Sequence, residues 1–317
     1  MHAPILPPAR HRPPPEPAGP RDPPIPVRPA ASREQGVGQR SPSVHRNPGV
    51  FTADMCACHR CAAAASSPPS IVQRVSQPLI AAHRGANEFL PEHSLAAFRQ
   101  AIVEGADAFE FDIRLTADGH LVLHHDRTIK RTSDGKGAVA DLTLAQLREY
   151  NFAHRFPHCA GNPEAERIPT LEDLFGLVVD SGKHIRLLIE AKHPCKFGPR
   201  LELRLWETLR RWPGLDVTVM SFSRAALKTW RGLDSDTPLV WIFEYPFRRP
   251  PEGVQVLSSR VDYIDSTPDF VERSHEAGYE VYTWTVNDAD TAHRMAGLEV
   301  DLIFTDRPAA IRQTLTG

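Results

Sequence analysis

From Leu79 onward, short apolar runs alternate with stretches whose apolar residues recur at helical spacing. Residues that favour the start of a helix precede several of these stretches: Ser94, Thr170 (with Asp173 three residues later), Ser223, Thr267 and Asp288. The apolar runs predict eight strands, over 79–83, 108–113, 185–191, 217–222, 239–243, 263–265, 281–286 and 302–305. Eight strands alternating with helices across 77–317 predict an α/β fold, the (β/α)8 TIM barrel. The alternative, an open doubly wound sheet, would require a glycine-rich loop after the first strand, and the sequence has none there.

One apolar run departs from this alternation. The run 121–125 follows the second strand after the short turn Ala117-Asp118-Gly119. Parallel neighbours need a longer crossover, so this run is expected to return antiparallel as a β-hairpin. The hairpin would place His125 roughly opposite Asp112, and 127–168 would be a small insertion with one helix over 143–150.

The first 76 residues have a different character. Sixteen of the 30 prolines lie there, without helical or strand periodicity, which predicts a disordered Pro-rich tail over 1–76 before a single TIM-barrel domain over 77–317. The tail contains the cluster Cys56, Cys58, His59 and Cys61, which is either a metal site or an unstructured stretch.

Composition and charge narrow the functional classes. The chain is 41% hydrophobic with a formal net charge of −2, which excludes global disorder and gives no electrostatic basis for binding nucleic acid. No apolar run has the length of a transmembrane segment. The odd number of cysteines and the lack of a signal-peptide pattern lead us to expect a cytoplasmic protein with reduced thiols.

Polar residues gather at the predicted carboxyl ends of the strands, where the active site of a TIM barrel lies. Glu110, Asp112 and Glu190 are carboxylates that would repel one another unless a cation lay between them, and oxygen ligands suit Mg²⁺ or Ca²⁺. His83 and His125 form a plausible acid/base pair, and Arg84 and Lys192 are cations suited to a phosphate. Together these residue types predict metal-assisted displacement at a phosphodiester.

The order of these motifs resembles the glycerophosphodiester phosphodiesterase family. The fragments that carry the resemblance are His83-Arg84-Gly85, Pro91-Glu92, Phe109-Glu110-Phe111-Asp112, Thr116-Ala117-Asp118-Gly119, His125-Asp126, Arg131-Thr132, Ile168-Pro169-Thr170-Leu171, Glu190-Ala191-Lys192, Trp284-Thr285-Val286-Asn287 and Thr305-Asp306. They extend from about Leu79 to Pro308.

The resemblance implies a role for each matching residue. His83 and His125 would be the catalytic acid/base pair, and Glu110, Asp112 and Glu190 the metal ligands. Arg84 and Lys192 would contact the phosphate, and Trp284 would form a wall of the substrate pocket. The resemblance also implies that the glycerol 2-hydroxyl attacks phosphorus to give a cyclic phosphate, which water opens to glycerol 3-phosphate after an alcohol has left.

One position departs from the family pattern. His93 stands where the family usually has asparagine after Pro-Glu, which puts the loop's positioning and its pH dependence in question. Glu92 either anchors this loop or belongs to the site, and we expect Glu92, His93 and Asn287 to surround the reacting groups. We expect His124, by strand alternation, to face away from His125.

Two other functions stay open. The same site would suit a lysophospholipase D or a sphingomyelinase D-like enzyme, and an apolar groove near Phe247 would favour that alternative. The segment 241–249, which mixes aromatics with two arginines, either touches a lipid headgroup or caps the barrel. A catalytically inactive binding barrel is the third hypothesis. The sequence identifies neither the leaving alcohol nor an oligomeric state.

Overall fold

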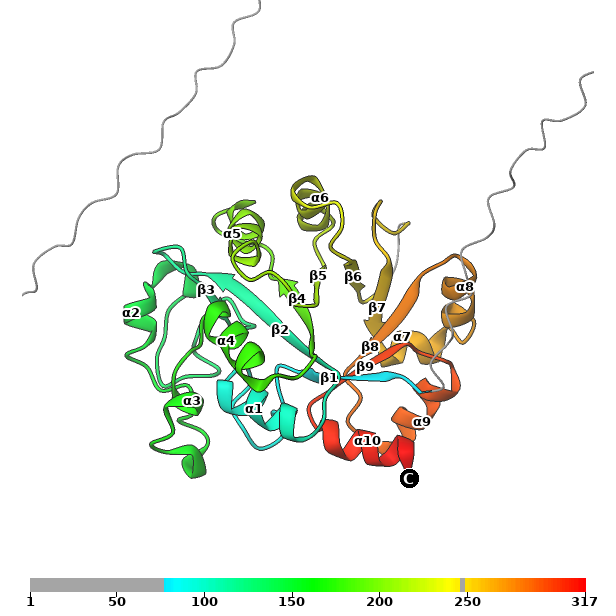
Figure 1. Cartoon of the computed structure of the whole chain (residues 1–317), viewed down its shortest axis with the longest axis horizontal. Coiled ribbons are helices and arrows are strands. Elements are labelled where there is room, and N and C mark those ends of the chain that lie inside the picture. Colours follow the sequence, from blue (N-terminus) through cyan, green and yellow to red (C-terminus); the bar gives the residue numbers. More distant parts are fainter. Residues whose placement is uncertain (1–76, 246–248) are drawn as a thin grey trace, which may run out of the picture. The chain divides into compact units, whose positions relative to one another are not determined.

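The computed structural model describes residues 77–245 and 249–317, which form a closed barrel of eight parallel strands (Figure 1). The barrel closes because β1 pairs with both β2 and β9, so the predicted TIM barrel is confirmed. Its strands are β1 (Leu79–His83), β2 (Ala108–Leu115), β4 (Arg186–Ala191), β5 (Val217–Ser221), β6 (Leu239–Phe243), β7 (Val256–Arg260), β8 (Glu280–Trp284) and β9 (Leu302–Thr305).

Helices connect the strands and cover the outside of the barrel, as α5 and α6 do beside β4 to β6 in Figure 1. They are α1 (Leu95–Val103), α2 (Leu144–Leu147), α3 (Pro163–Glu166), α4 (Leu171–Ser181), α5 (Arg200–Leu209), α6 (Arg224–Leu233), α7 (Val261–Ser266), α8 (Phe270–Glu276), α9 (Ala289–Gly297) and α10 (Pro308–Thr316), with the short 3₁₀ turns η1 (Val139–Asp141) and η2 (Pro157–Cys159). Four predicted N-caps are confirmed, since a backbone N–H donates to the side chain of Ser94, Thr170, Ser223 and Asp288.

Alternation along the strands creates two apolar layers and positions the polar site. On β2, Phe109, Phe111 and Ile113 face outward into the large cluster beneath the helices. The smaller cluster fills the interior, with Leu188, Met220 and Ile242 among its members. Because side chains alternate along a strand, Glu110 and Asp112 face the barrel interior.

The predicted hairpin is present, one residue out of the expected register. β3 (Leu121–Leu123) runs antiparallel to β2, with Leu123 opposite Ile113. His124 therefore lies opposite Asp112, whose carbonyl accepts its N–H at 3.0 Å, and His125 lies one residue beyond. In the insertion, the predicted helix over 143–150 is the shorter α2, which packs against Val122 of β3.

The strand predicted over 263–265 is wrong, because these residues belong to helix α7 and the strand of this repeat is β7. β7 lacks an apolar signature at Ser258 and Ser259, although both are fully buried. The Ser259 hydroxyl is satisfied by donating to the Phe243 carbonyl at 3.0 Å. Thr267 consequently ends α7, and α8 starts after Asp269.

Two groups of expectations concern residues outside the ranges that the structure describes. The tail predicted to be disordered and its cysteine cluster lie within 1–76, and Phe247 lies within 246–248. Within the described ranges, no helix combines the length and the apolarity needed to cross a bilayer.

Candidate active site

A cavity of about 180 Å³ lies at the carboxyl ends of the strands. Its polar lining includes six residues predicted from the sequence: His83, Arg84, Glu110, His125, Glu190 and Lys192. Its apolar lining is Met220, Phe222, Ile242, Trp284 and Phe304. The barrel thus brings the two predicted histidines, two of the carboxylates and both cations into one space.

Three buried carboxylates form the most concentrated charge of this site. Glu110 and Asp112 lie two residues apart on β2, and Glu190 stands beside Asp112 on β4. One oxygen from each lies within 4.8 Å of the others, which is the arrangement of a cation site. Both oxygens of Asp112 are buried, and in the described part of the chain they have ion-pair contacts but no hydrogen bond. These all-oxygen donors therefore fit Mg²⁺ or Ca²⁺.

Burial and mutual repulsion give the three carboxylates different pKa values. Burial, followed by the charge of Asp112, raises the pKa of Glu190 to about 8 and that of Glu110 well above its usual value. Burial also opposes ionisation of Asp112, but the charge of Lys192, the contact with His93 and the charge of Arg84 hold its pKa well below the usual range. A divalent cation would relieve the repulsion that raises the other two.

Two cations flank these carboxylates. The Lys192 Nζ lies 3.0 Å from Asp112 Oδ1 and 2.8 Å from Glu190 Oε1. On the other side, Arg84 Nε lies 3.3 Å from Asp112 Oδ2. Burial lowers the pKa of Lys192, but Asp112 and Glu190 outweigh it and raise the pKa above its ordinary value, so the ammonium stays charged. The cavity therefore presents fixed positive charge beside its acidic cluster.

Each histidine of the cavity has an aspartate on its Nδ1 atom. The distance is 2.7 Å from His83 Nδ1 to Asp306 Oδ1, and 2.7 Å from His125 Nδ1 to Asp126 Oδ1. Because a carboxylate only accepts, Nδ1 carries the proton in both rings and Nε2 is left for other partners. His83 Nε2 lies 3.9 Å from Glu110 Oε2. Burial lowers the pKa of His125 below its usual value, so its ring is neutral at pH 7.

These two aspartates were given no role in the sequence prediction. Their only signal was position, since Asp126 directly follows His125 and Asp306 ends the last strand motif. Asn287, by contrast, was expected near the site, and its amide donates to Asp306 Oδ2 at 2.6 Å. Burial raises the pKa of Asp306, but hydrogen bonds from His83, Asn287 and Asn87 lower it below the usual range.

The β1–α1 loop holds a strained backbone beside the cavity. Arg84 and His93 have positive φ angles of 59° and 62°, and Gly85 between them has 86°. A Cβ on Gly85 would lie 2.7 Å from the Cβ of Ala97, so only glycine fits there. The Arg84 N–H donates to the Glu110 carbonyl at 2.8 Å, which ties this loop to β2. Such conformations persist where the surroundings fix them, typically at functional sites.

His93, the departure from the family pattern, serves this loop as a neutral ring. Its Nε2 accepts the N–H of Asp112 at 3.1 Å. Burial lowers the pKa of His93 despite the neighbouring carboxylates, so the ring does not add charge near neutral pH. His124 also lies outside the cavity, between the Asp126 carbonyl and the Thr132 hydroxyl.

Glu92 links this loop to the insertion. It accepts from Arg84 Nη1 at 3.0 Å and from Arg131 Nη2 at 2.8 Å. Arg131 also donates to Asp126, the partner of His125, at 2.7 Å. Burial raises the pKa of Glu92, but Arg131 and the other neighbouring cations outweigh it and bring the value to about 2. The geometry therefore places Glu92 in a chain of ion pairs from Arg84 to the second histidine.

The apolar wall of the cavity is built on Trp284 and Phe222. Their ring centroids lie 5.9 Å apart with an interplanar angle of 80°. Phe222 was not predicted for the site, and it is 43% exposed directly after β5. An exposed aromatic residue at the carboxyl end of a barrel strand is the signal that could have identified it.

Comparisons with known proteins agree with this geometry. A family model described as the glycerophosphoryl diester phosphodiesterase family matches residues 83–310. A probable glycerophosphodiester phosphodiesterase 1 of Mycobacterium tuberculosis is 34% identical over 254 residues, covering 75% of this chain and 92% of the relative. A glycerophosphodiester phosphodiesterase of Caldanaerobacter subterraneus is 31% identical, covering 74% and 96%.

Solved structures share the fold. An Oleispira antarctica phosphodiesterase, in complex with the product sn-glycerol-3-phosphate, matches with a TM-score of 0.67 at 23% identity, covering 76% of this chain and 98% of that one. A putative glycerophosphoryl diester phosphodiesterase of Silicibacter pomeroyi matches with a TM-score of 0.66 at 26% identity, covering 75% and 93%.

Proposed function

Since this chain belongs to the glycerophosphoryl diester phosphodiesterase family, a family of phosphoric diester hydrolases, we propose that it hydrolyses glycerophosphodiesters to sn-glycerol 3-phosphate and an alcohol. One observation carries this proposal. Two histidines, each with an aspartate on Nδ1, line the same cavity as Glu110 and Glu190 of the carboxylate cluster. Such a site offers two proton-transfer groups beside a place for a cation.

The carboxylates Glu110, Asp112 and Glu190 would hold the divalent cation, Mg²⁺ or Ca²⁺. When bound, such a cation supplies positive charge that stabilises the charge developing on the phosphoryl oxygens. Lys192 and Arg84 add charge from the protein and orient the diester through its non-bridging oxygens. Trp284 and Phe222 form the apolar side on which the carbon skeleton of the glycerol packs.

We assign the proton transfers from the state of the rings. His125 is neutral at pH 7, so its Nε2 accepts the proton of the glycerol 2-hydroxyl as the 2-oxygen bonds to phosphorus. The bond from phosphorus to the alcohol oxygen breaks, and protonated His83, whose charge Asp306 stabilises, donates its Nε2 proton to that oxygen. A cyclic glycerophosphate remains. His83 then accepts a proton from water as the water oxygen bonds to phosphorus, and His125 returns its proton to the departing 2-oxygen.

Release of glycerol 3-phosphate from glycerophosphocholine tests this function. We expect activity to be lost in EDTA and restored by Mg²⁺ or Ca²⁺. His125→Ala and His83→Ala should each lower kcat by about 10²-fold or more, the contribution typical of a general acid or base. His120→Ala is the matched control. His120 is exposed at the hairpin turn, so this substitution should leave kcat unchanged. Full activity of both cavity variants would contradict the assignment.

A lysophospholipase D or sphingomyelinase D-like activity on the same site is the second candidate. The apolar lining and the exposed ring of Phe222 favour it, because an acyl chain attached to the glycerol could pack there. Faster cleavage of lysophosphatidylcholine than of glycerophosphocholine, reversed by Phe222→Ala, would support this candidate. Cleavage of neither diester with any cation would leave the binding barrel as the remaining hypothesis.

A further inference from the structure

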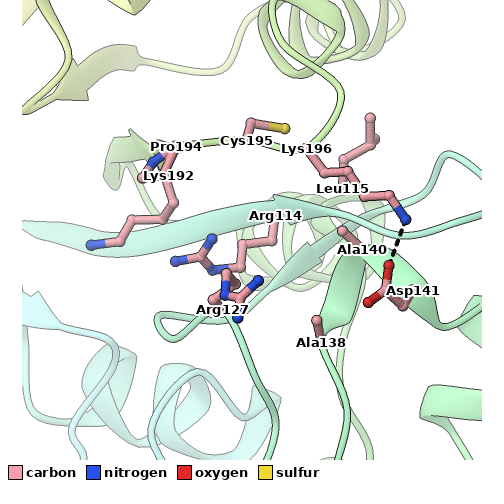
Figure 2. Close-up of a pocket in the computed structure, with 10 residues that line it drawn as sticks. All are labelled: Arg114, Leu115, Arg127, Ala138, Ala140, Asp141, Lys192, Pro194, Cys195 and Lys196. Atoms are coloured by element: carbon pink, nitrogen blue, oxygen red, sulfur yellow. Dashed lines mark hydrogen bonds and ion pairs between the residues drawn. The ribbon is translucent and has the colours of Figure 1, made fainter.

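A second cavity, of about 250 Å³, has four cations in its lining, Arg114, Arg127, Lys192 and Lys196 (Figure 2). Its walls come from the end of β2, from the insertion and from the loop after β4. Lys192 lines both cavities, so the two adjoin at this residue. The second cavity therefore lies on the other side of a residue to which we assign a phosphate contact.

The charges of this second cavity are not balanced. Lys192 is occupied by Asp112 and Glu190, and Lys196 is paired with Asp141, the single carboxylate of the lining, at 2.5 Å (Figure 2). Arg114 and Arg127 have no carboxylate within ion-pair distance among residues 77–245 and 249–317. Two guanidinium groups thus line one cavity without an ion-pair partner in the described ranges, although the charges of Asp112, Glu190 and Asp126 act on Arg114 and that of Asp141 acts on Arg127.

The position of Arg114 connects this excess charge to catalysis. Its Nε and Nη2 donate to the carbonyl of His125 at 2.9 and 2.6 Å, so its positive charge is held by a neutral group. Glu110, Asp112 and Arg114 share one face of β2, and Arg114 lies about 7 Å beyond Asp112 toward the mouth of the barrel at the rise of a strand. Burial raises the pKa of the neighbouring Cys195, so its thiol does not supply the missing negative charge.

The two arms of a bound diester would meet opposite surroundings. Trp284 on β8 stands across the ring from β4, whose carboxyl end leads to the cationic cavity. The ring of Trp284 suits the glycerol, and the side of β2 and β4 suits a polar or charged leaving group. Phe222 belongs to the β4 side, since it follows the neighbouring strand β5 and its ring centroid lies 5.9 Å from Lys192 Nζ. Guanidinium groups bind carboxylates and phosphates in a planar, directed manner.

We propose, building on the proposed function, that the cavity of Arg114 and Arg127 binds the leaving alcohol and selects alcohols that carry an anionic group, a carboxylate or a phosphate. Arg127 is the exposed member that meets this group, and Arg114 also fixes the backbone of His125. The sequence alone did not identify the leaving alcohol, and in this proposal the two arginines select it by its negative charge.

A matched pair of diesters tests this proposal. Glycerophosphoserine differs from glycerophosphoethanolamine by one carboxylate, so the ratio of their kcat/KM values isolates the anionic group. Glycerophosphoinositol 4-phosphate against glycerophosphoinositol is the corresponding pair for a phosphate. We expect the enzyme to favour the anionic member of at least one pair, and Arg127→Gln to lower that ratio about tenfold, which is the value of one charge-assisted hydrogen bond.

The control variant is Arg155→Gln, an equal change of charge at an exposed arginine of the same insertion that does not line this cavity. Its ratio should stay within twofold of the wild type. The inference is overturned if the wild type hydrolyses both members of each pair equally, or if Arg127→Gln lowers both rates by the same factor. Failure of the proposed function looks different, because the wild type would then cleave none of the four diesters.

Discussion

The Nδ1 atom of His83 lies 2.7 Å from Oδ1 of Asp306, and this contact joins the end of the first strand to the residue after the last. Asp306 also accepts from Asn87 at 3.0 Å and from Asn287 at 2.6 Å. The carboxylate is thereby fixed by three donors, His83 at the end of β1 and Asn87 and Asn287 in two loops. Closure of the barrel between β9 and β1 consequently sets the orientation of His83.

Asp306→Asn should lower kcat for glycerophosphocholine by about 10²-fold, because the amide no longer stabilises protonated His83 or enforces its Nδ1–H tautomer. Steady-state kinetics between pH 5 and 9 would check this, and the alkaline limb of the profile, where the general acid loses its proton, should move to lower pH. Asp301→Asn is the control: Asp301 forms the same type of pair with His275 at 2.8 Å, at the other end of the barrel. An equal loss in both variants would indicate instability instead of a role at His83.

Cation binding should depend on pH through the carboxylate cluster. The pKa of Glu190 is raised to about 8, so this group carries a proton below that pH and a divalent cation must displace it. Because the pKa of Glu110 is raised as well, we expect apparent affinity for Mg²⁺ or Ca²⁺ to rise with pH up to at least about pH 8, by about tenfold per pH unit for each proton displaced. Isothermal titration calorimetry in two buffers of different ionisation enthalpy would measure the released proton. Glu190→Gln should weaken binding and flatten the pH dependence, and equal wild-type affinity at pH 6 and 8 would refute the assignment.

Much of the barrel could be predicted because its strands are buried on both faces and therefore appear as apolar runs. The bounds of β1, β6 and β9 agree with the predicted runs. β7 was not predicted because Ser258 and Ser259 are buried polar residues, which do not contribute to an apolar pattern. Pattern recognition finds elements whose burial is apolar and misses those whose burial is satisfied by polar contacts.

Some residues of the candidate site could likewise be predicted from the sequence, and others could not. Its charged residues at strand ends could be predicted because two-residue spacing places Glu110 and Asp112 on one face, and the same holds for Glu190 and Lys192. The aspartates that contact the Nδ1 atoms of the two histidines could not be predicted in this way. Sequence spacing does not indicate that residue 306 faces residue 83. The ion pairs of Arg131 with Glu92 and Asp126 likewise depend on how the insertion folds back over the barrel.

Gly85→Ala should destabilise the fold severely, because the new Cβ would lie 2.7 Å from Ala97 Cβ and 2.9 Å from its carbonyl carbon, at a φ of 86°. We expect the free energy of unfolding to fall by about 3 kcal/mol or more, measured by urea denaturation. Gly119→Ala separates strain from the clash, since Gly119 has a φ of 87° but nothing within 4 Å of the added atom. That variant should lose only about 1 kcal/mol, and equal losses would show that backbone strain alone decides.

The buried ring of His124 should make the fold sensitive to mild acid. Burial lowers its pKa to about 4, whereas an unfolded chain has about 6.5, so between these values the unfolded state binds more protons. This contribution to stability is full above pH 6.5 and is lost as the pH falls toward 4, by about 3 kcal/mol in total. In His124→Asn, the amide can still donate to the Asp126 carbonyl but does not titrate. Urea denaturation at pH 7 and pH 4.5 should show a smaller loss for the variant than for the wild type, and parallel losses would mean that other groups control acid unfolding.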